Sequence, residues 1–165
     1  IFQSVTAYYL QDRFLLSLNE TAKSTALVLG SMAAMSIVSQ LTIVQSFKGS
    51  PLRLIWWSIP FFLASSIVIV FSYNFNWVLI GMSLMGLGMG LASPGYTASA
   101  SLNADKNNQG AVVGLAMIAP GVGFALGPLL SGFLYQANLT FPFLFTIPLF
   151  LIASFLIFQL DEKSF

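Results

Sequence analysis

The chain has 165 residues, of which 57% are hydrophobic and only 7% are charged, and its mean hydropathy is +0.87. Soluble domains are about 45–50% apolar and about 25% charged, so six basic and five acidic side chains cannot cover a soluble domain of this length. The high apolar content excludes a disordered chain, and a net charge of +1 provides no basic surface for nucleic acid. Because the chain has no cysteine and no histidine, it lacks disulfides, thiolate nucleophiles, imidazole bases and the usual zinc ligands. We therefore predict an integral membrane protein.

Charged residues divide the chain into three tracts that carry no charge, residues 24–47, 54–104 and 107–160. A membrane-spanning helix needs about 20 apolar residues, so the first tract can hold one span and the other two can hold two spans each. Polar turn residues divide the two long tracts, which gives predicted spans at 24–47, 54–73, 77–100, 110–135 and 141–160. Residues 1–11 are predicted to be the end of a sixth span, because the chain starts at Ile1 rather than at a methionine and is interpreted as a fragment. The predicted fold class is an all-α polytopic membrane helical bundle whose first helix is truncated.

The span 24–47 carries a mostly polar stripe at helical spacing. Its members are Ser31, Met35, Ser39, Thr42 and Ser46, which recur every three or four residues and therefore share one helical face. One interpretation is that this face borders an aqueous substrate path. The other is tight helix packing, in which each small hydroxyl bonds its own helix backbone.

The span 77–100 contains Ser93-Pro94-Gly95-Tyr96-Thr97 near its end. Proline removes a helical hydrogen bond and glycine loosens the backbone, so a helix break is predicted here. A break within a membrane is tolerated where protein or a wet cavity satisfies the backbone, which makes Ser93, Tyr96 and Thr97 candidate cavity residues. A plain structural kink is the alternative.

Glycine is concentrated in two of the predicted spans, 77–100 and 110–135, which hold eleven of the thirteen glycines. Helices in lipid associate where small residues allow close backbone approach, so these two spans are predicted to pack against other helices. The glycine-free spans 54–73 and 141–160 are predicted to lie at the periphery. Ile69, in the first of these, is accordingly expected to face lipid.

The most specific sequence feature is Gly114-x8-Gly123-x3-Gly127-Pro128-x2-Ser131-Gly132. Its four-residue spacing places Gly123 and Gly127 on one helical face, where another backbone can approach. Pro128 is expected to bend the helix. A bulky residue in place of Gly127 is expected to force the packed helices apart.

This motif resembles a signature of the major facilitator superfamily, and in particular of its drug:proton antiporter branch. That signature ends Gly-Pro-x-x-Gly-Gly in the fifth of twelve helices, and the present chain differs at Ser131. The loop 47–53 lacks the acidic residue, and the span 77–100 lacks the arginine, that are typical of the N-terminal half of such transporters. The stretches 108–115 and 127–135 look like the region of the tenth and eleventh helices. The resemblance thus implies the C-terminal six-helix half, from the end of helix seven through helix twelve and a tail.

The resemblance also implies which residues serve which role. Helices seven, eight, ten and eleven of the family border a central cavity, while helices nine and twelve face lipid. The implied substrate-cavity residues are Gln3, Thr6, Tyr9, Ser39, Gln40, Ser93 and Tyr96. The helix-packing motif comprises Gly114, Gly123, Gly127, Pro128 and Gly132. No catalytic residue, metal site or cofactor is predicted.

The predicted function is half of a secondary active transporter that moves a small hydrophobic or amphipathic solute by alternating access, with proton-coupled drug efflux as the expected form. An enzyme is not expected, because the spans offer hydroxyls without a general base. The alternative is a channel or a structural membrane subunit without active transport. The expected partners are membrane lipid, a small-molecule substrate, the missing N-terminal half and protons. The spans contain no carboxylate, so a proton-carrying residue is expected in the missing half.

The lysines and arginines of the loops predict the orientation of the spans. One side would hold Lys48, Arg53, Lys106 and Lys163, and the other side Arg13 and Lys23. Because cytoplasmic loops are enriched in lysine and arginine, loops 48–53 and 101–109 and the C-terminal tail are predicted to be cytoplasmic. The predicted location is the cell membrane, inner or plasma, with multiple passes.

Overall fold

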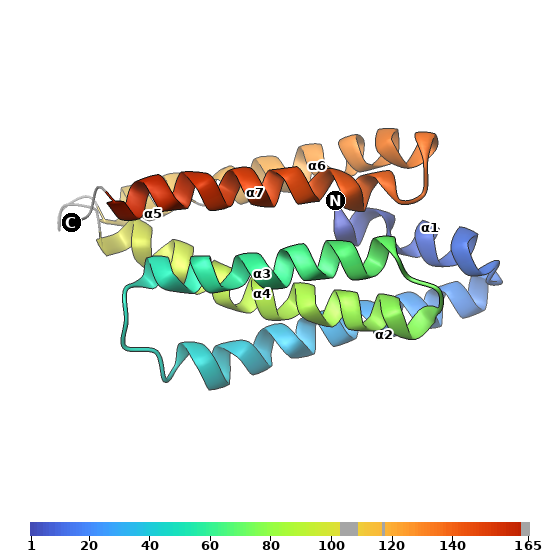
Figure 1. Ribbon diagram of the computed structural model, residues 1–165, viewed down its shortest axis with the longest axis horizontal. Coiled ribbons are helices and arrows are strands. Elements are labelled where there is room, and N and C mark those ends of the chain that lie inside the picture. Colours follow the sequence, from blue (N-terminus) through green and yellow to red (C-terminus); the bar gives the residue numbers. More distant parts are fainter. Residues whose placement is uncertain (103–108, 117, 163–165) are drawn as a thin grey trace.

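A computed structural model describes residues 1–102, 109–116 and 118–162, and in these ranges the chain is helical with short connections and no strand (Figure 1). The prediction of an all-α bundle is confirmed. The helices are α1 (Phe2–Phe14), α2 (Leu18–Ser39), the π-helical turn η1 (Gln40–Val44), α3 (Pro51–Val70), α4 (Phe75–Leu102), α5 (Gln109–Ala116), α6 (Ile118–Ala137) and α7 (Phe141–Glu162). The region predicted as one span, 110–135, corresponds to α5 and α6.

The connection between α1 and α2 is determined by local side-chain chemistry. Leu15 ends α1 in the left-handed conformation with φ 53°. Ser17 then begins α2 with a capping box, in which its hydroxyl accepts from the Glu20 amide and its own amide donates to the Glu20 carboxylate at 2.9 Å. A capping box satisfies backbone donors that a helix start leaves unpaired. The chain therefore reverses direction within a few residues.

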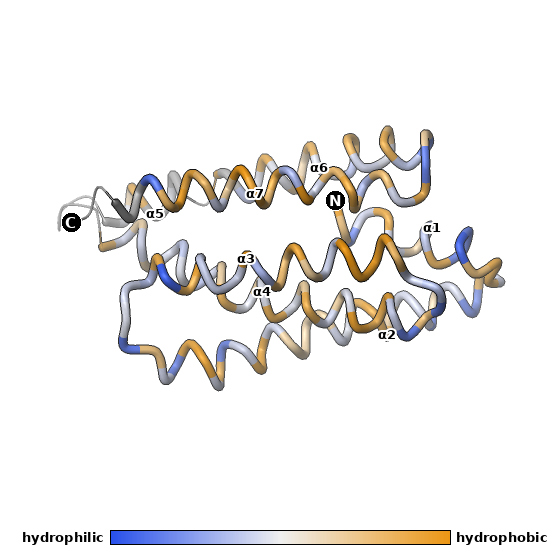
Figure 2. Tube along the Cα trace, in the orientation of Figure 1, coloured by the Kyte–Doolittle hydropathy of each residue, from blue (hydrophilic) through white to orange (hydrophobic). Residues whose placement is uncertain are grey.

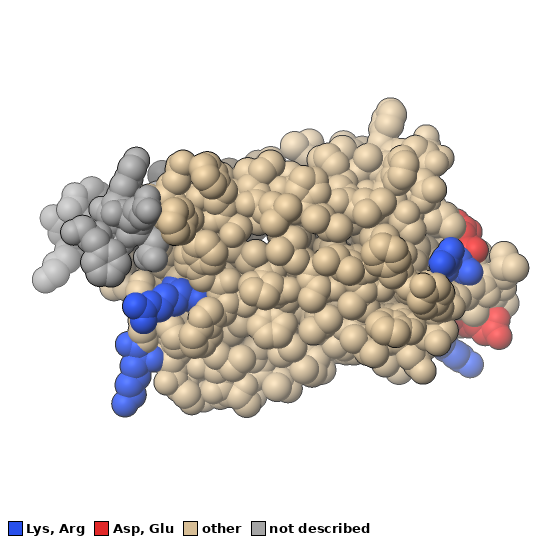
Figure 3. Space-filling model, viewed as in Figure 1, with Lys and Arg blue, Asp and Glu red and all other residues tan. Residues whose placement is uncertain are grey.

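Four helical segments in the described ranges are long and apolar enough to cross a membrane: Leu18–Val44, Pro51–Val70, Phe75–Leu102 and Phe141–Gln159. Hydrophobic residues recur along their lengths (Figure 2). The charged side chains visible in the space-filling view gather at the two ends of the bundle, and the surface between them carries none (Figure 3). This distribution matches an apolar hydrocarbon layer between two aqueous interfaces, and the multi-pass membrane prediction is confirmed.

Helix α4 lies at the centre of the packing and makes its most extensive contact with α3. Gly81, Gly88 and Gly95, spaced seven residues apart, meet this antiparallel neighbour. Added Cβ atoms there would lie 2.6 Å from the Phe62 ring at Gly88 and 2.9 Å from the Pro51 carbonyl at Gly95. A seven-residue repeat keeps one seam of a helix facing its partner, so this contact extends over most of α3.

A second glycine face of α4 packs on α2, which runs in the same direction. An added Cβ at Gly86 would overlap the backbone carbonyl of Met32, and one at Gly90 would overlap Ser36 and Ser39. Backbone contacts of this kind are possible only for glycine. The prediction that the span 77–100 is a packing helix is therefore confirmed.

The glycine-free helix α3 is more enclosed than expected, because it lies between α4 and α7. Three of its buried side chains are serines: Ser58, Ser65 and Ser66 are all 0% exposed. Serine is small enough to allow close helix approach, as glycine does. The expectation that Ile69 faces lipid is wrong, since Ile69 is fully buried and its side chain lies against Gly81.

The helix break predicted at Pro94 is also wrong, because α4 continues without interruption from Phe75 to Leu102 with Pro94 inside it. Gly95 next to it is buried against the first turn of α3. Packing on α3 thus holds the helical conformation that the proline weakens. Pro128 likewise lies inside the continuous helix α6.

Candidate substrate cavity and the glycine helix

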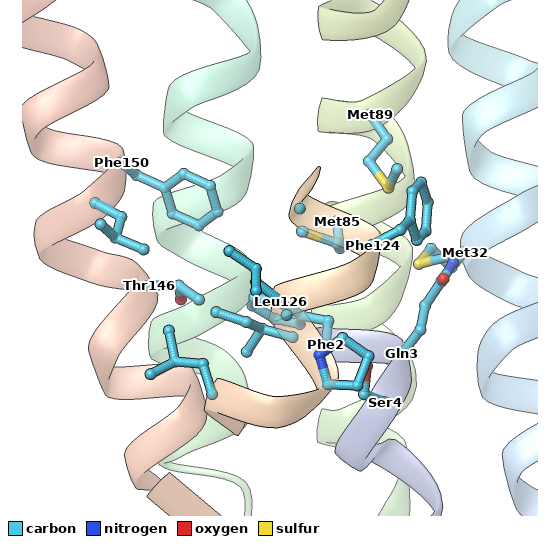
Figure 4. A pocket seen from close by; sticks show the side chains of 16 residues that line it. Phe2, Gln3, Ser4, Met32, Met85, Met89, Phe124, Leu126, Thr146 and Phe150 are labelled. Carbon is cyan, nitrogen blue, oxygen red and sulfur yellow. The ribbon is translucent and has the colours of Figure 1, made fainter. Parts of the chain in front are cut away.

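A cavity of about 440 Å³ lies between the first turn of α1 and the middle of α2, α4, α6 and α7 (Figure 4). Its walls are mainly apolar. The lining includes methionines of α2 and α4 and aromatic or aliphatic residues of α6 and α7: Met32, Met85, Met89, Phe124, Leu126, Leu130, Leu149 and Phe150. A volume of this size and an apolar lining are typical of sites for small organic molecules.

The methionines reach the cavity because of the packing of α4. Met85 and Met89 are one helical turn apart and so share a face, and Met32 is placed beside them by its backbone contact with Gly86. Methionine is unbranched and adapts to differently shaped apolar partners. The sequence analysis did not identify these methionines, although the four-residue spacing of Met85 and Met89 on α4 was a visible signal.

The polar groups at the cavity differ in whether they have partners. The Thr146 hydroxyl donates to the Phe143 carbonyl at 2.6 Å and shares a 2.8 Å hydrogen bond with Ser66. Gln3 extends toward Met32 and Phe124 (Figure 4), and its amide forms no hydrogen bond to the described residues. Gln3 is exposed, so its amide is accessible, and among the polar side chains at the cavity it is the one best able to bind a polar group of a ligand.

Two of the predicted cavity residues of α1 are inside the helix packing instead. Thr6 is 1% exposed and donates to the Phe2 carbonyl at 2.6 Å. Tyr9 is 0% exposed, donates to the Ile69 carbonyl at 3.0 Å and shares a 2.8 Å hydrogen bond with Ser72. Of the three candidates on α1, the structure places Gln3 alone on the cavity.

The remaining cavity candidates lie on α2, η1 and α4, apart from this cavity. Ser39 is buried beside Gly90, and its hydroxyl donates to the Ser36 carbonyl at 3.0 Å. Gln40 is exposed at the start of η1, Ser93 is exposed on α4, and Tyr96 is half-buried. Ser31, Ser39 and Thr42 of the polar stripe all bond carbonyls of their own helix, as the packing interpretation requires.

The residues of the glycine–proline motif differ in whether they line the cavity and in whether another segment approaches them closely. Gly123, Gly127 and Pro128 are cavity-lining. An added Cβ at Gly127 would lie 3.2 Å from the backbone nitrogen of Ile1, whereas Gly114, Gly123 and Gly132 have no atom within 4 Å of that position. The expected close approach of another helix is therefore present within this chain only at Gly127.

The charged and metal-ligating side chains stay away from the cavity. Within the described ranges, no group of three or more His, Cys, Asp or Glu side chains could hold a metal ion. None of the residues lining the cavity is charged at its side chain. The arrangement thus fits binding of an apolar or weakly polar molecule by contact and shape.

Comparison with known proteins agrees with this architecture. The family model described as Major Facilitator Superfamily matches residues 2–164, which is nearly the whole chain. No curated protein matches the chain. The chain belongs to the Major Facilitator Superfamily, a family of membrane transporters.

Proposed function

We propose that this chain is the C-terminal half of a secondary active transporter that moves a small hydrophobic or amphipathic solute by alternating access. The family match over residues 2–164 carries the proposal. In such transporters two halves rock about a site near the middle of the membrane. Helices α1 through α7 then represent the end of helix seven through helix twelve.

The cavity supports the proposed substrate class. Its methionine and phenylalanine side chains offer adaptable apolar contact, and the Gln3 amide offers one hydrogen-bonding group. A solute with a large apolar part and few polar groups fits both features. Proton-coupled drug efflux is the form of transport that we propose, with the proton-carrying carboxylate in the other half.

The uncovered face of α6 supports the assignment to one half of a larger bundle. Leu129 and Phe133 are 69% and 79% exposed, and Leu126, which also lines the cavity, is 58% exposed. Gly123, also at the cavity, has no described atom within 4 Å of an added Cβ. Small residues in membrane helices usually mark protein-facing surfaces. We propose that the missing N-terminal half covers this face in the complete transporter.

A second role for the cavity follows from its position at the first turn of α1. Ile1 to Ser4 line it, and a helix that continued α1 ahead of Ile1 would run into the space between α4, α6 and α7. The apolar walls suit a helix as well as a solute. In that case the cavity is a packing slot, and the solute contacts lie on other faces of the same helices.

The orientation is proposed from the described charges. Lys48 and Arg53 flank the connection from η1 to α3 at one end of the bundle, while acidic and basic residues share the opposite end. We propose that the Lys48–Arg53 end, and with it the C-terminus, is cytoplasmic, in a cell membrane. Lys106 and Lys163, which contributed to that prediction, lie outside the described residues.

Transport by the full-length protein in proteoliposomes tests the proposal. With ethidium as the fluorescent amphipathic probe, we expect saturable movement against its gradient when a pH gradient is imposed. Flux that never exceeds equilibration would instead indicate a channel or a structural subunit. Transport that ignores the pH gradient would refute proton coupling alone.

A substitution inside the cavity separates its two roles. Met89→Trp is expected to raise the KM for ethidium at least about fivefold at unchanged melting temperature if a solute occupies the cavity, because the larger ring fills its space. If the cavity is a helix slot, the variant loses stability instead. Ile80→Trp, on the same helix but away from the cavity and 50% exposed, is the matched control.

A further inference from the structure

Three helices end together at one end of the bundle. The C-terminal part of α1 contacts two other helix ends there: Tyr9 and Arg13 bond the end of α3 and Ser72 just after it, and Asp12 bonds α6. The last carbonyls of a helix have no partner within it, and they form the negative end of the helix dipole. Side-chain donors at such a site can therefore join one helix to another.

The bonds from α1 to α3 are several and mostly enclosed. The Tyr9 hydroxyl donates to the Ile69 carbonyl at 3.0 Å and contacts the Ser72 hydroxyl at 2.8 Å, both in buried surroundings. Arg13 donates to the Ser72 carbonyl at 3.1 Å, where its positive charge also suits the helix end. Breaking this set would expose unpaired buried polar groups.

The bond from α1 to α6 is a different kind of contact. The Tyr135 hydroxyl donates to the Asp12 carboxylate at 2.6 Å, and this pair lies at the surface. The Tyr135 ring also lies 6.3 Å from the Tyr8 ring in a tilted arrangement. In the described part of the chain this is the one side-chain hydrogen bond between α1 and α6. Water can replace both partners when it opens, so opening costs far less than in the buried set.

We propose that the Tyr135–Asp12 hydrogen bond is a latch that closes α6 onto α1, while the Tyr9, Arg13 and Ser72 bonds keep α1 attached to α3. When this end of the bundle opens, α6 moves away and α1 remains with α3. The role of this opening in substrate passage rests on the proposed transport function. The latch itself is a property of the bundle and is measurable without transport.

Distance measurement between two spin labels tests the latch directly. The chain contains no cysteine, and any cysteine in the other half would be replaced by serine. Labels at Leu15→Cys, which is 90% exposed, and at Ala137→Cys, also exposed, then report the separation of the ends of α1 and α6. In the full-length protein in phospholipid nanodiscs, Tyr135→Phe is expected to raise the ratio of long-distance to short-distance populations by about tenfold. That factor corresponds to about 1.4 kcal/mol.

Three further variants keep the test decisive. Asp12→Ala removes the acceptor and must produce the same lengthening, so an unchanged distribution in either variant overturns the latch. Tyr73→Phe is the matched control, because Tyr73 is 79% exposed and its hydroxyl bonds none of the described residues. Tyr9→Phe is expected to lower the melting temperature without separating the labels. If Tyr9→Phe separates the labels as much as Tyr135→Phe does, then the α1–α3 contact opens as easily as the α1–α6 contact, and the proposed difference between them is wrong.

The same measurement separates failure of the latch from failure of the transport proposal. If the labels separate in Tyr135→Phe but the protein moves no ethidium, the latch is supported and the transport proposal is contradicted. If the labels do not separate but the protein transports ethidium, the latch is refuted and the transport proposal is supported.

Discussion

Helices α4 and α6 are both rich in glycine, but the structure uses their glycines in opposite ways. Gly81, Gly86, Gly88, Gly90 and Gly95 of α4 all meet another helix where a Cβ would stand, and Gly121, Gly123 and Gly132 of α6 meet nothing within 4 Å. The difference follows from position, because α4 lies between α2 and α3 while α6 lies at the edge of the bundle. Small residues mark a surface suited to close packing, and they do not say whether the partner helix belongs to the same chain.

The largest effect is expected for Gly86→Leu in α4. The new side chain would overlap the Met32 backbone, which cannot move without separating α2 from α4, so a loss on the order of 3 kcal/mol or failure to fold is expected. Thermal unfolding followed by size-exclusion chromatography measures it. Gly30→Ala in α2 is the control, since nothing lies within 4 Å of its Cβ position. Equal melting temperatures for the two variants would contradict the inference that the close backbone contact at Gly86 holds α2 and α4 together.

Gly127→Leu is expected to have the next largest effect, mainly on function. Its side chain would enter the cavity beside Ile1, whose backbone nitrogen lies 3.2 Å from the Cβ position. We expect ethidium transport to fall more than about tenfold, with a stability loss of about 1–2 kcal/mol. Gly132→Leu, at an open position of the same helix, provides the reference. Normal transport by Gly127→Leu would show that neither a solute nor a helix needs this space.

Gly88→Ala tests whether the contact partner decides the effect. An added Cβ would lie 2.6 Å from atoms of the Phe62 ring, and a side chain can rotate away whereas a backbone cannot. A loss of about 1 kcal/mol in unfolding free energy is therefore expected, clearly below that of Gly86→Leu. A loss as large as that of Gly86→Leu would mean that α3 is held as rigidly against α4 as α2 is.

The smallest effect on folding is expected for Gly123→Ala in α6. The added methyl meets no atom of the described residues, and alanine favours a helix over glycine by up to about 1 kcal/mol, so the melting temperature should stay constant or rise. If the N-terminal half covers this face, assembly or transport by the full-length protein should nevertheless decrease. Unchanged stability together with unchanged transport would indicate that the face is exposed to lipid.

The outcome for the predicted cavity residues has a common physical cause. Gln3 reached the cavity, while Thr6 and Tyr9, one and two turns further along α1, became buried hydrogen-bonding residues. A polar residue in an apolar span must find some partner, and a helix backbone or a neighbouring helix end satisfies it as well as a water-filled path does. The positions of polar residues in the sequence do not show which of these partners a given side chain has.

Length and composition by themselves determined that this chain is a membrane-spanning helical bundle, and the positions of charge predicted where its spans lie. Those conclusions rest on two constraints that act on each segment separately, the thickness of the hydrocarbon layer and the cost of charge within it. The tertiary structure alone decided the rotation of each helix. It turned Ile69 inward, kept α4 helical through Pro94, and gave every glycine of α4 a close partner but, among the glycines of α6, only Gly127. In a span where nearly every position is apolar, helix rotation depends on shape complementarity between segments distant in sequence.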